Sequence, residues 1–376
     1  MPHDGDILRD LEGSRPPSSP SGLAPVGVAT RRTAIGPTEG PMQFSLGLGL
    51  TNECNLSCPH CYRDVNGLQR LGLDQVRAIL HRLPVRSANL GTGENGLHPD
   101  YLPIVEALQD AGVKVSLTSN GYSVARLPDG LLKGFHEVEF SFDHATPRGQ
   151  DAFRGAGAWD MAMGSLHRAR EAGVEVTVLA VMMATNYREL PAIAHLARSV
   201  GANFRVNVYQ PVQTDRFMLR YEQFWEGFRR VLAEIPLLST TEPVLRGALG
   251  LPTGPPSGCG RRTVRVSPKG TVIPCVYWPE QSEPLSRLLE EGPGIVNTPA
   301  FVACRNAPPA CPACKDVPAC GGGCAGRRAL AGRRDEPDPF CPFARGQRIA
   351  IDYQMAPQRE LVKVGSACTT VFATKD

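Results

Sequence analysis

From residue 42 onward, short runs of apolar residues alternate with segments in which apolar residues recur at the spacing of one helix face. The run 44–50 alternates large apolar residues with small ones, which is typical of a strand. In 73–83, leucine, valine and isoleucine fall at helical spacing, with Asp74 in the first turn. The predicted strands are 44–50, a short one ending at 89–91, 113–119, 138–142, 174–183 and 204–209, and the predicted helices are 73–83, 102–108, 159–172 and 190–200.

The order of strand and helix repeats along this part of the chain, and several helices end at a glycine before the next strand. This order predicts an α/β fold in which helices cover the outside of a parallel sheet. Six strands are too few for a closed barrel of eight, so we expect a partial, open barrel. In such folds ligands bind at the carboxyl ends of the strands. A further helix is predicted at 221–234, and the regular alternation stops at Cys259.

The composition of the chain indicates a cellular compartment and a type of chemistry. The chain has 376 residues, 12 of them cysteine, and its 40 Lys and Arg nearly balance its 37 Asp and Glu. This balance gives no field that would recruit nucleic acid or a membrane surface, so we expect neither as a partner. Residues 1–41 are rich in proline, serine and glycine and lack the apolar core of a secretory signal, so we expect a disordered leader and a cytoplasmic protein. In the reducing cytosol, clustered cysteines bind metal or perform redox chemistry.

Three of the cysteines follow directly on the first predicted strand. Cys54, Cys58 and Cys61 have the spacing C-x3-C-x2-C. Three thiolates on one short loop can bind three irons of a cubane and leave the fourth iron without a protein ligand. A structural zinc site has four closed ligands, and an electron-transfer [4Fe–4S] cluster normally has four cysteines. The trio therefore indicates an iron that is open to another ligand.

This loop resembles the signature of the radical S-adenosylmethionine (SAM) superfamily, whose members carry it after the first strand of a partial (β/α)6 barrel. The resemblance implies that the open iron chelates SAM and that an electron from the reduced [4Fe–4S] cluster cleaves the sulfonium. The product, a 5′-deoxyadenosyl radical, would abstract a hydrogen atom from the substrate. The resemblance also implies an electron donor of the flavodoxin or ferredoxin type. A zinc knuckle or a chance spacing is the other interpretation of the trio.

The resemblance extends to the carboxyl ends of the second, third and fourth strands. The segment after the second strand looks like the Gly-Gly-Glu segment of the family, whose backbone holds the methionyl amine, with Thr92 in place of an expected glycine. Turn formation or strand-end capping is the alternative role for these residues. The SAM contacts that the resemblance implies are Gly91, Thr92, Gly93, Glu94, Ser119, Asn120, Ser141 and Asp143.

A second string of seven cysteines has the spacing C-x10-G-x4-C, then C-x2-C-x5-C-x3-C, then one more cysteine. This string resembles the SPASM domain, an extension of peptide-modifying members that holds two auxiliary [4Fe–4S] clusters. The implied ligands are Cys259, Cys275 and Cys324 for the inner cluster and Cys311, Cys314, Cys320 and Cys341 for the outer cluster. In the rival interpretation, four thiolates between 311 and 324 enclose one zinc ion.

The inner cluster lacks a fourth cysteine at the expected place, because none lies between Cys61 and Cys259. Its remaining iron is either open, bound by the substrate, or bound by Cys304 or Cys368. We expect an open or substrate-bound iron, which leaves Cys304 and Cys368 as unliganded thiols.

The sequence thus predicts a partial (β/α)6 barrel of the radical SAM type followed by a small, irregular, cysteine-rich cluster-binding domain. The predicted segments are a leader at 1–41, the barrel at 42–215, a helical linker at 216–258, the SPASM domain at 259–345 and a tail at 346–376. The predicted function is an oxidative modification or crosslink of a side chain in a ribosomally made peptide. The alternatives are the same chemistry on a small molecule such as an aminoglycoside-type sugar, and a zinc scaffold without catalysis. No residue is assigned as the catalytic base.

The iron and zinc interpretations differ in colour and metal content. We expect the protein purified without oxygen to be brown, to absorb at about 400 nm and to contain far more iron than zinc. Elemental analysis and an absorption spectrum check this expectation, and a colourless protein with zinc in excess would contradict it.

Overall fold

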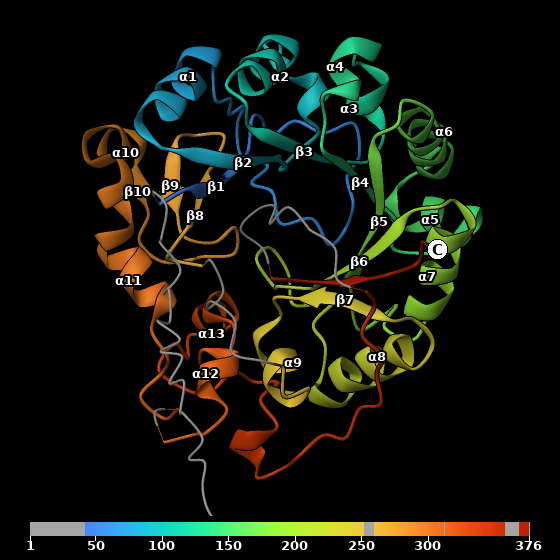
Figure 1. Ribbon diagram of the computed structural model, residues 1–376, viewed down its shortest axis with the longest axis vertical. Helices are drawn as coiled ribbons and strands as arrows, with labels where there is room; N and C mark the ends of the chain where they lie inside the picture. The colour runs from blue at the N-terminus through green and yellow to red at the C-terminus, as the bar shows by residue number, and fades with distance from the viewer. Residues whose placement is uncertain (1–41, 252–258, 312, 358–367, 376) are drawn as a thin grey trace, which may run out of the picture. The chain divides into compact units, whose positions relative to one another are not determined.

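One mixed sheet runs through the described part of the chain. The computed structural model describes residues 42–251, 259–311, 313–357 and 368–375, so the predicted leader at 1–41 lies outside the described residues. Within these ranges the sheet has eleven strands in the order β10-β9-β8-β1-β2-β3-β4-β5-β6-β11-β7 (Figure 1). The sheet is open, because β10 and β7 are its two edges.

Six consecutive strands pair in parallel and correspond to the six that the sequence predicts. They are β1 (Phe44–Leu48), β2 (Val85–Leu90), β3 (Lys114–Ser119), β4 (Glu137–Ser141), β5 (Glu175–Met182) and β6 (Asn203–Val208). The long helices between them lie outside the curved sheet (Figure 1), namely α1 (Leu73–Arg82), α2 (Tyr101–Asp110), α6 (Ala158–Glu171) and α7 (Leu190–Ser199). The predicted α/β fold with a partial barrel is confirmed.

The remaining helices are shorter, except for the predicted helix α8 (Tyr221–Glu234). Before α8 they are η1 (Asn95–Leu97), α3 (Tyr122–Ala125), α4 (Asp129–Lys133) and α5 (Pro147–Arg154). After α8 they are α9 (Pro243–Ala248), α10 (Leu285–Glu291), η2 (Gly292–Asn297), α11 (Pro299–Arg305), α12 (Val317–Cys320), α13 (Ala325–Leu330) and η3 (Phe343–Arg345). Among the helices of the described ranges, none is long and apolar enough to cross a membrane.

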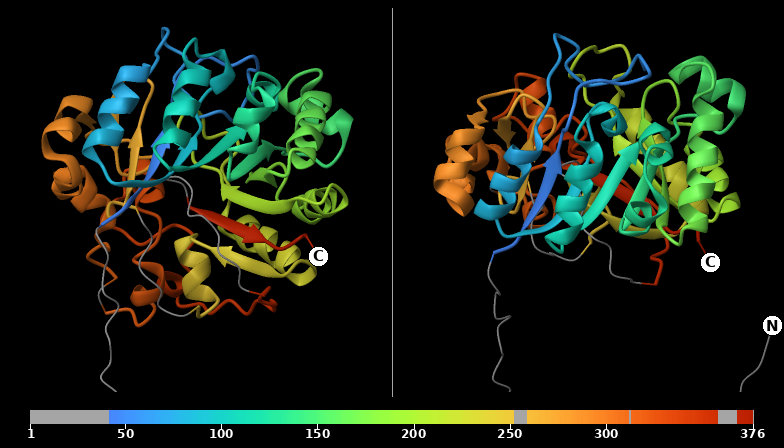
Figure 2. Two further views of the ribbon diagram at one scale, coloured as in Figure 1. Left: turned by 45° about the horizontal axis from the view of Figure 1, so that its top comes forward. Right: turned by 90° about the horizontal axis from the view of Figure 1, so that it is seen from above.

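The sheet is longer at both ends than the sequence predicts. At one end β8 (Thr263–Val266) pairs in parallel with β1, and β9 (Thr271–Ile273) and β10 (Glu283–Pro284) follow in antiparallel. At the other end β11 (Thr369–Phe372) lies antiparallel between β6 and β7 (Leu237–Thr240), as Figure 2 shows. The count of six strands is therefore too low. The added strands have two to four residues each, which is too few to produce a readable period.

The predicted boundaries between barrel, linker, SPASM domain and tail stay a prediction, but the sheet crosses each of them. The predicted linker contributes β7, the predicted SPASM domain contributes β8, and the predicted tail contributes β11. The described residues from 42 onward also belong to one compact unit. The cysteine-rich region is thus joined to the barrel by backbone pairing as well as by side-chain packing.

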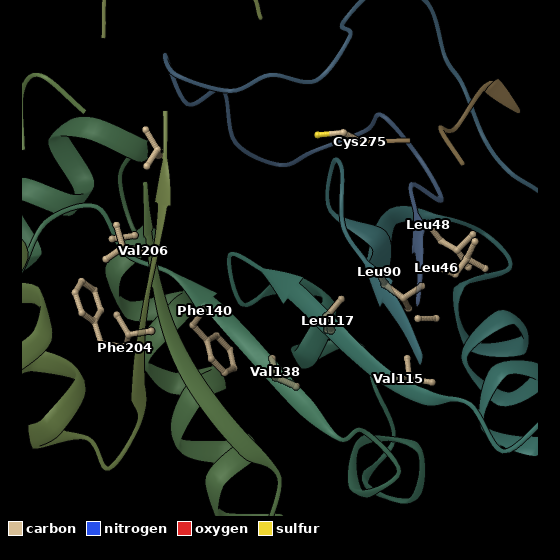
Figure 3. Close-up of a cluster of buried hydrophobic side chains, with 14 of the residues drawn as sticks. Leu46, Leu48, Leu90, Val115, Leu117, Val138, Phe140, Phe204, Val206 and Cys275 are labelled. Carbon is tan, nitrogen blue, oxygen red and sulfur yellow. The ribbon is translucent and has the colours of Figure 1, made fainter. Parts of the chain in front are cut away.

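The parallel strands present an apolar face to the helices and a polar face to the interior. Because side chains alternate along a strand, one set of positions packs under the helices. Figure 3 shows part of this buried core, including Leu46, Leu90, Leu117 and Phe140. The alternate positions carry serine, asparagine, threonine, glutamate and arginine, which are also buried. The interior of the partial barrel is therefore polar.

An ion-pair cluster holds the middle of this polar face. Arg205 on β6 lies between two carboxylates of β4, with Nη2 3.3 Å from Glu137 Oε2 and Nη1 in contact with Glu139 Oε1. Thr118 and Thr177 donate further hydrogen bonds to Glu139 and Glu137, respectively. Burial raises the pKa of Glu139, with the charge of Glu137 acting in the same direction and Arg205 opposing both. One arginine therefore offsets the negative charge of two buried carboxylates.

Replacement of this arginine should be costly and dependent on pH. We expect Arg205→Met to lower the free energy of unfolding by about 3–5 kcal/mol near pH 8, because it leaves two buried carboxylates without a cation. Loss of Arg205 raises the pKa of Glu139 further, so the folded variant takes up a proton that the unfolded chain does not hold. The deficit should therefore shrink as the pH falls to about 5, which urea unfolding at both pH values measures.

The matched control is Arg188→Met. Arg188 makes an exposed ion pair with Glu226 at 3.0 Å, and its loss should change stability by less than about 1 kcal/mol at either pH. Equal deficits for the two variants, or a deficit of Arg205→Met that grows toward low pH, would contradict the assignment.

Candidate functional site

A cavity of about 200 Å³ opens at the carboxyl ends of the parallel strands. The loop after β1 contributes Cys54, Cys58 and Cys61 to its wall. The ends of β2, β3 and β4 contribute most of the predicted SAM contacts, namely Gly91, Thr92, Gly93, Glu94, Ser119, Asn120 and Ser141. The structure therefore brings the cysteine trio and these strand ends together. Ligation by the trio and binding of SAM by these residues stay predictions.

The cysteine loop is shaped by its own backbone and by one arginine. The Cys61 amide donates to the Cys58 carbonyl at 3.1 Å, and the Leu56 amide donates to Cys54 Sγ at 3.4 Å. The Arg63 guanidinium donates to the carbonyls of Asn52 and Leu56 at 2.8 and 3.0 Å and so closes the loop. These bonds turn the three thiols toward one cavity.

Burial controls the charge of these thiols. It raises the pKa of Cys54 to about 11 and also raises the pKa of Cys58. The thiols of Cys54 and Cys58 are therefore protonated at neutral pH when no metal is bound, and metal binding must release these two protons. None of the described cysteines forms a disulfide.

The segment after β2 docks on the cysteine loop through a left-handed turn. Gly93 has a φ of +63°, and a Cβ at this position would lie 2.4 Å from the carbonyl oxygens of Thr51 and Glu53. Only glycine permits this approach. The Glu94 amide then donates to the Glu53 carbonyl at 2.7 Å. This contact fixes the distance between the two segments.

Thr92 stands where the family pattern has a glycine. It has a φ of +87°, which threonine rarely adopts, so the family pattern of glycine is understandable at this position. Its hydroxyl compensates by bonding to Tyr62 at 3.2 Å and by accepting from Arg265 on β8. The strained residue thus links the cysteine loop, the β2 end and the cysteine-rich region.

Glu94 acts as a hub for the ends of β2 and β3. Oε1 accepts hydrogen bonds from the Ser119 hydroxyl at 2.5 Å and from the Ser123 amide and hydroxyl, and Oε2 accepts from the Asn120 amide at 3.0 Å. Burial raises the pKa of Glu94, and these bonds oppose that effect. The carboxylate of Glu94 and the hydroxyl of Ser119 are therefore bonded to each other, and Glu94 positions Asn120 beside the cysteine loop. The side-chain nitrogen Nδ2 of Asn120 lies 3.7 Å from Cys54 Sγ.

Asp143 differs from the other predicted contacts, because it lies behind the cavity wall and binds Arg154 of α5. Helix α5 begins with a Thr146 cap and Pro147 at its first position, and ends at Arg154. Arg154 Nη2 lies 2.6 Å from Asp143 Oδ2, and Nη1 lies 3.9 Å from Cys58 Sγ. Burial alone would raise the pKa of Asp143, but Arg154 and then His60 outweigh it and hold the pKa below its ordinary value. Asp143 is not among the residues that line the cavity, whereas Arg154 is, and the SAM contact predicted for Asp143 stays a prediction.

His60 packs inside the loop. Its ring stacks on Phe153 with centroids 5.0 Å apart, and Nε2 lies 3.4 Å from Asp143 Oδ2. Burial lowers the pKa of His60 to about 4, although the charge of Asp143 opposes this, so the ring is neutral at physiological pH. Neither the Arg154 contact nor this stacking follows from a local motif, because both depend on α5 folding back.

The far wall of the cavity carries polar atoms available to a ligand. Asn207 Oδ1 and Gln210 Oε1 are buried and have no hydrogen-bond partner within the described ranges. The charged side chains of Glu139, Arg205 and Arg265 line the same wall. A polar molecule with hydrogen-bond donors would satisfy the two orphaned oxygens.

A second, smaller cavity of about 60 Å³ lies in the cysteine-rich region and is lined by thiols of the predicted inner set together with Cys304 and Cys368. The predicted outer set gathers separately, since Cys311 is affected by the charges of Cys341, Cys320 and Cys314. Cys324 lines the smaller cavity, whereas Cys311 and Cys314 are not among its lining residues, and the zinc interpretation of these four thiols stays an alternative. No group of three His, Cys, Asp or Glu in the described ranges could hold a single metal ion.

Three consecutive residues join the two cavities. Cys275 lines the smaller cavity, whereas Val276 and Tyr277 line the larger one. The Tyr277 ring packs edge-on against Tyr62, next to Cys61, with centroids 5.6 Å apart.

Comparisons with known proteins agree with this geometry. The sequence model of the radical SAM superfamily matches residues 48–197. The chain is similar to the mycofactocin maturase MftC of Mycobacterium ulcerans, with 27% identity covering 82% of this chain and 90% of that protein. It is also similar to the PqqA peptide cyclase of Ruegeria pomeroyi, with 26% identity covering 80% and 87%.

Two solved structures share the fold. One is anSMEcpe with bound AdoMet and the Cp18Cys peptide, with a TM-score of 0.62, 16% identity and coverage of 81% of this chain and 95% of that one. The other is SuiB of Streptococcus suis bound to its precursor peptide SuiA, with a TM-score of 0.57, 14% identity and coverage of 82% and 75%.

The hub role of Glu94 can be tested without cofactors. We expect Glu94→Gln to lower the free energy of unfolding by about 2 kcal/mol, because the new amide group would face donors that now bond to the carboxylate. Urea unfolding measures the change. In the control Glu226→Gln, an exposed carboxylate is altered and the change should stay under about 1 kcal/mol. A Glu94→Gln protein as stable as the control would show that the hub is not needed.

Proposed function

Since residues 48–197 are a radical SAM domain, we propose that this enzyme holds a [4Fe–4S] cluster on Cys54, Cys58 and Cys61 and cleaves SAM reductively. The deoxyadenosyl radical then abstracts a hydrogen atom from a side chain of a ribosomally made peptide. The observation that carries the proposal is the convergence of three thiols and the strand ends on one cavity.

The donor set fits such a cluster. Three thiols line the cavity, one for each of three irons of a cluster. The cavity also has room for a further ligand. The chemistry that the cluster supplies when bound is the one-electron reduction of the SAM sulfonium.

The protein contributes positioning and electrostatics. The left-handed turn at Thr92 and Gly93 presents backbone to the cavity without side-chain bulk, and Glu94 holds the Asn120 side chain beside Cys54. Arg154 places a cation beside Cys58, where it stabilises thiolate over thiol. Asn207 and Gln210 offer acceptors to a bound molecule.

The relatives favour a peptide as substrate. The mycofactocin maturase and the PqqA peptide cyclase match most of this chain, and one structural neighbour is bound to its precursor peptide. The alternative of a small-molecule substrate gains nothing from these relatives. We therefore propose a peptide maturase, with an electron donor of the flavodoxin or ferredoxin type.

The second cavity supports a net oxidation. Formation of a new bond or a carbonyl from the substrate radical requires one more electron to leave. We propose that the inner and outer thiol sets hold auxiliary [4Fe–4S] clusters and that the inner one accepts this electron. Cys275 lines the smaller cavity and the next residue, Val276, lines the larger one, so the two cavities are adjacent along the chain.

The reaction is tested by anaerobic reconstitution with iron, sulfide and a reductant. We expect 5′-deoxyadenosine from SAM, and a peptide encoded beside this gene should lose two hydrogen atoms in mass. One deoxyadenosine should form per product, with no SAM regenerated.

Variants separate the steps of this test. The variant Cys54→Ala/Cys58→Ala/Cys61→Ala should lose about four irons and all cleavage. The control Cys314→Ala/Cys341→Ala should lose iron but keep cleavage. Full recovery of SAM would contradict a net oxidation, and cleavage by the triple variant would contradict the assigned cluster site.

A further inference from the structure

Five cysteine side chains converge on the smaller cavity. Three of them, Cys259, Cys275 and Cys324, are the ligands that the sequence resemblance implies, and Cys304 and Cys368 are additional. The thiol of Cys275 lies within hydrogen-bonding reach of Cys259, so the implied trio is already assembled. Cys320 also borders this cavity, but its charge interactions are with Cys314 and Cys341 of the outer set. The structure therefore offers two candidates for a fourth ligand.

We propose that Cys368 is the fourth thiolate ligand of the inner auxiliary cluster, which makes that cluster fully protein-ligated. The proposal rests on the proposed function in assigning a [4Fe–4S] cluster to this cavity. It replaces the expectation of an open or substrate-bound iron. When the Fe–S bond forms, the Cys368 thiol loses its proton to solvent, and no electron is transferred.

The position of Cys368 relative to the other thiols favours it. Its thiol lies within hydrogen-bonding reach of both Cys259 and Cys324, so it contacts two of the three implied ligands. Cys304 interacts with the same two thiols only through charge. Cys304 also belongs to α11, whose backbone geometry fixes the direction of its side chain, whereas Cys368 directly precedes β11.

Backbone pairing holds Cys368 in place. The next residue, Thr369, donates its amide to Thr241 Oγ1 at 2.9 Å and accepts from the Thr241 amide at 2.7 Å. The Thr370 and Thr240 hydroxyls bond at 2.8 Å, so β11 is fixed on β7. Thr369 lines the larger cavity, whereas Cys368 lines the smaller one. The strand therefore places Cys368 at the wall between the two sites.

A glycine next to Cys259 allows close packing at this cavity. Gly260 has a φ of +68°, and a Cβ there would lie 2.4 Å from the Phe301 carbonyl oxygen. The residue after Cys259 therefore packs directly against α11, the helix that carries Cys304. The buried Arg328 lies near Cys304 and Cys324 and supplies positive charge for a thiolate-rich site.

The test uses the full-length chain with Cys54, Cys58 and Cys61 replaced by Ala, so that only auxiliary clusters are built. After anaerobic reconstitution, this background should hold about eight irons. Mild oxidation followed by EPR and Mössbauer spectroscopy then reports whether any cubane has a labile iron. We expect the background to give no [3Fe–4S] signal, and we expect added Cys368→Ala to give about one [3Fe–4S] cluster per chain.

The matched control is added Cys304→Ala, which should leave the spectra and the iron content unchanged. A [3Fe–4S] signal from Cys304→Ala but not from Cys368→Ala would overturn the proposal, and so would a signal from the background itself. The unchanged spectrum of the outer cluster reports that each variant has folded.

Failure of the Cys368 proposal and failure of the proposed SAM reaction give different results. About four irons in the background would also overturn the proposal, by showing that the inner cavity holds no cluster. The SAM reaction would stand, because it is measured as deoxyadenosine in the protein that retains the first cysteine trio.

Discussion

The alternation of side chains along the parallel strands is the constraint on which both the core and the site depend. One set of positions is apolar and packs under the helices, and the other set lines the interior with serine, threonine, asparagine and charged groups. A conventional closed barrel fills its interior with branched apolar side chains. Here the interior must stay hydrated or filled by a ligand, and the Arg205 cluster makes this polar face stable.

The polar face also explains the position of the chemistry. The larger cavity lies where the polar positions reach the strand ends, and the cysteine loop closes over it. The turn at Thr92 and Gly93 couples that loop to the sheet, and Arg265 couples the turn to β8. Hydrogen bonds therefore link the cysteine-rich region to residues of the cavity wall as well as to the barrel strands.

The sequence predicted local features well and long-range ones poorly. The six parallel strands and the cysteine loop were readable because each has its own periodicity or spacing within a few residues. Strands β8 and β11 were missed because each has four residues and pairs with a distant partner. Arg154 was missed for a similar reason, since its contact with Asp143 requires α5 to fold back on β4. The SAM contact expected of Asp143 stays a prediction, and the structure adds that Arg154 binds this carboxylate.

Cysteine positions illustrate the same limit. Spacing alone grouped the seven cysteines of the second string and left Cys304 and Cys368 as two further thiols that could join them, with an open or substrate-bound iron expected instead. Helix α11 and strand β11 bring both thiols to one cavity, and neither element is visible as a pattern in the sequence. The number of thiols at the inner site is a property of the tertiary structure.

The location of β11 between β6 and β7 affects the order of assembly. Thr370 bonds to Thr240 across 130 residues of chain, so β7 cannot join the sheet until that intervening length has been synthesised. Contacts of such large sequence separation are entropically costly to close and slow to form. The barrel strands can pair early during translation, whereas this edge and the thiols beside it are organised late. The five thiols of the smaller cavity, Cys368 among them, therefore come together only after this edge of the sheet has formed.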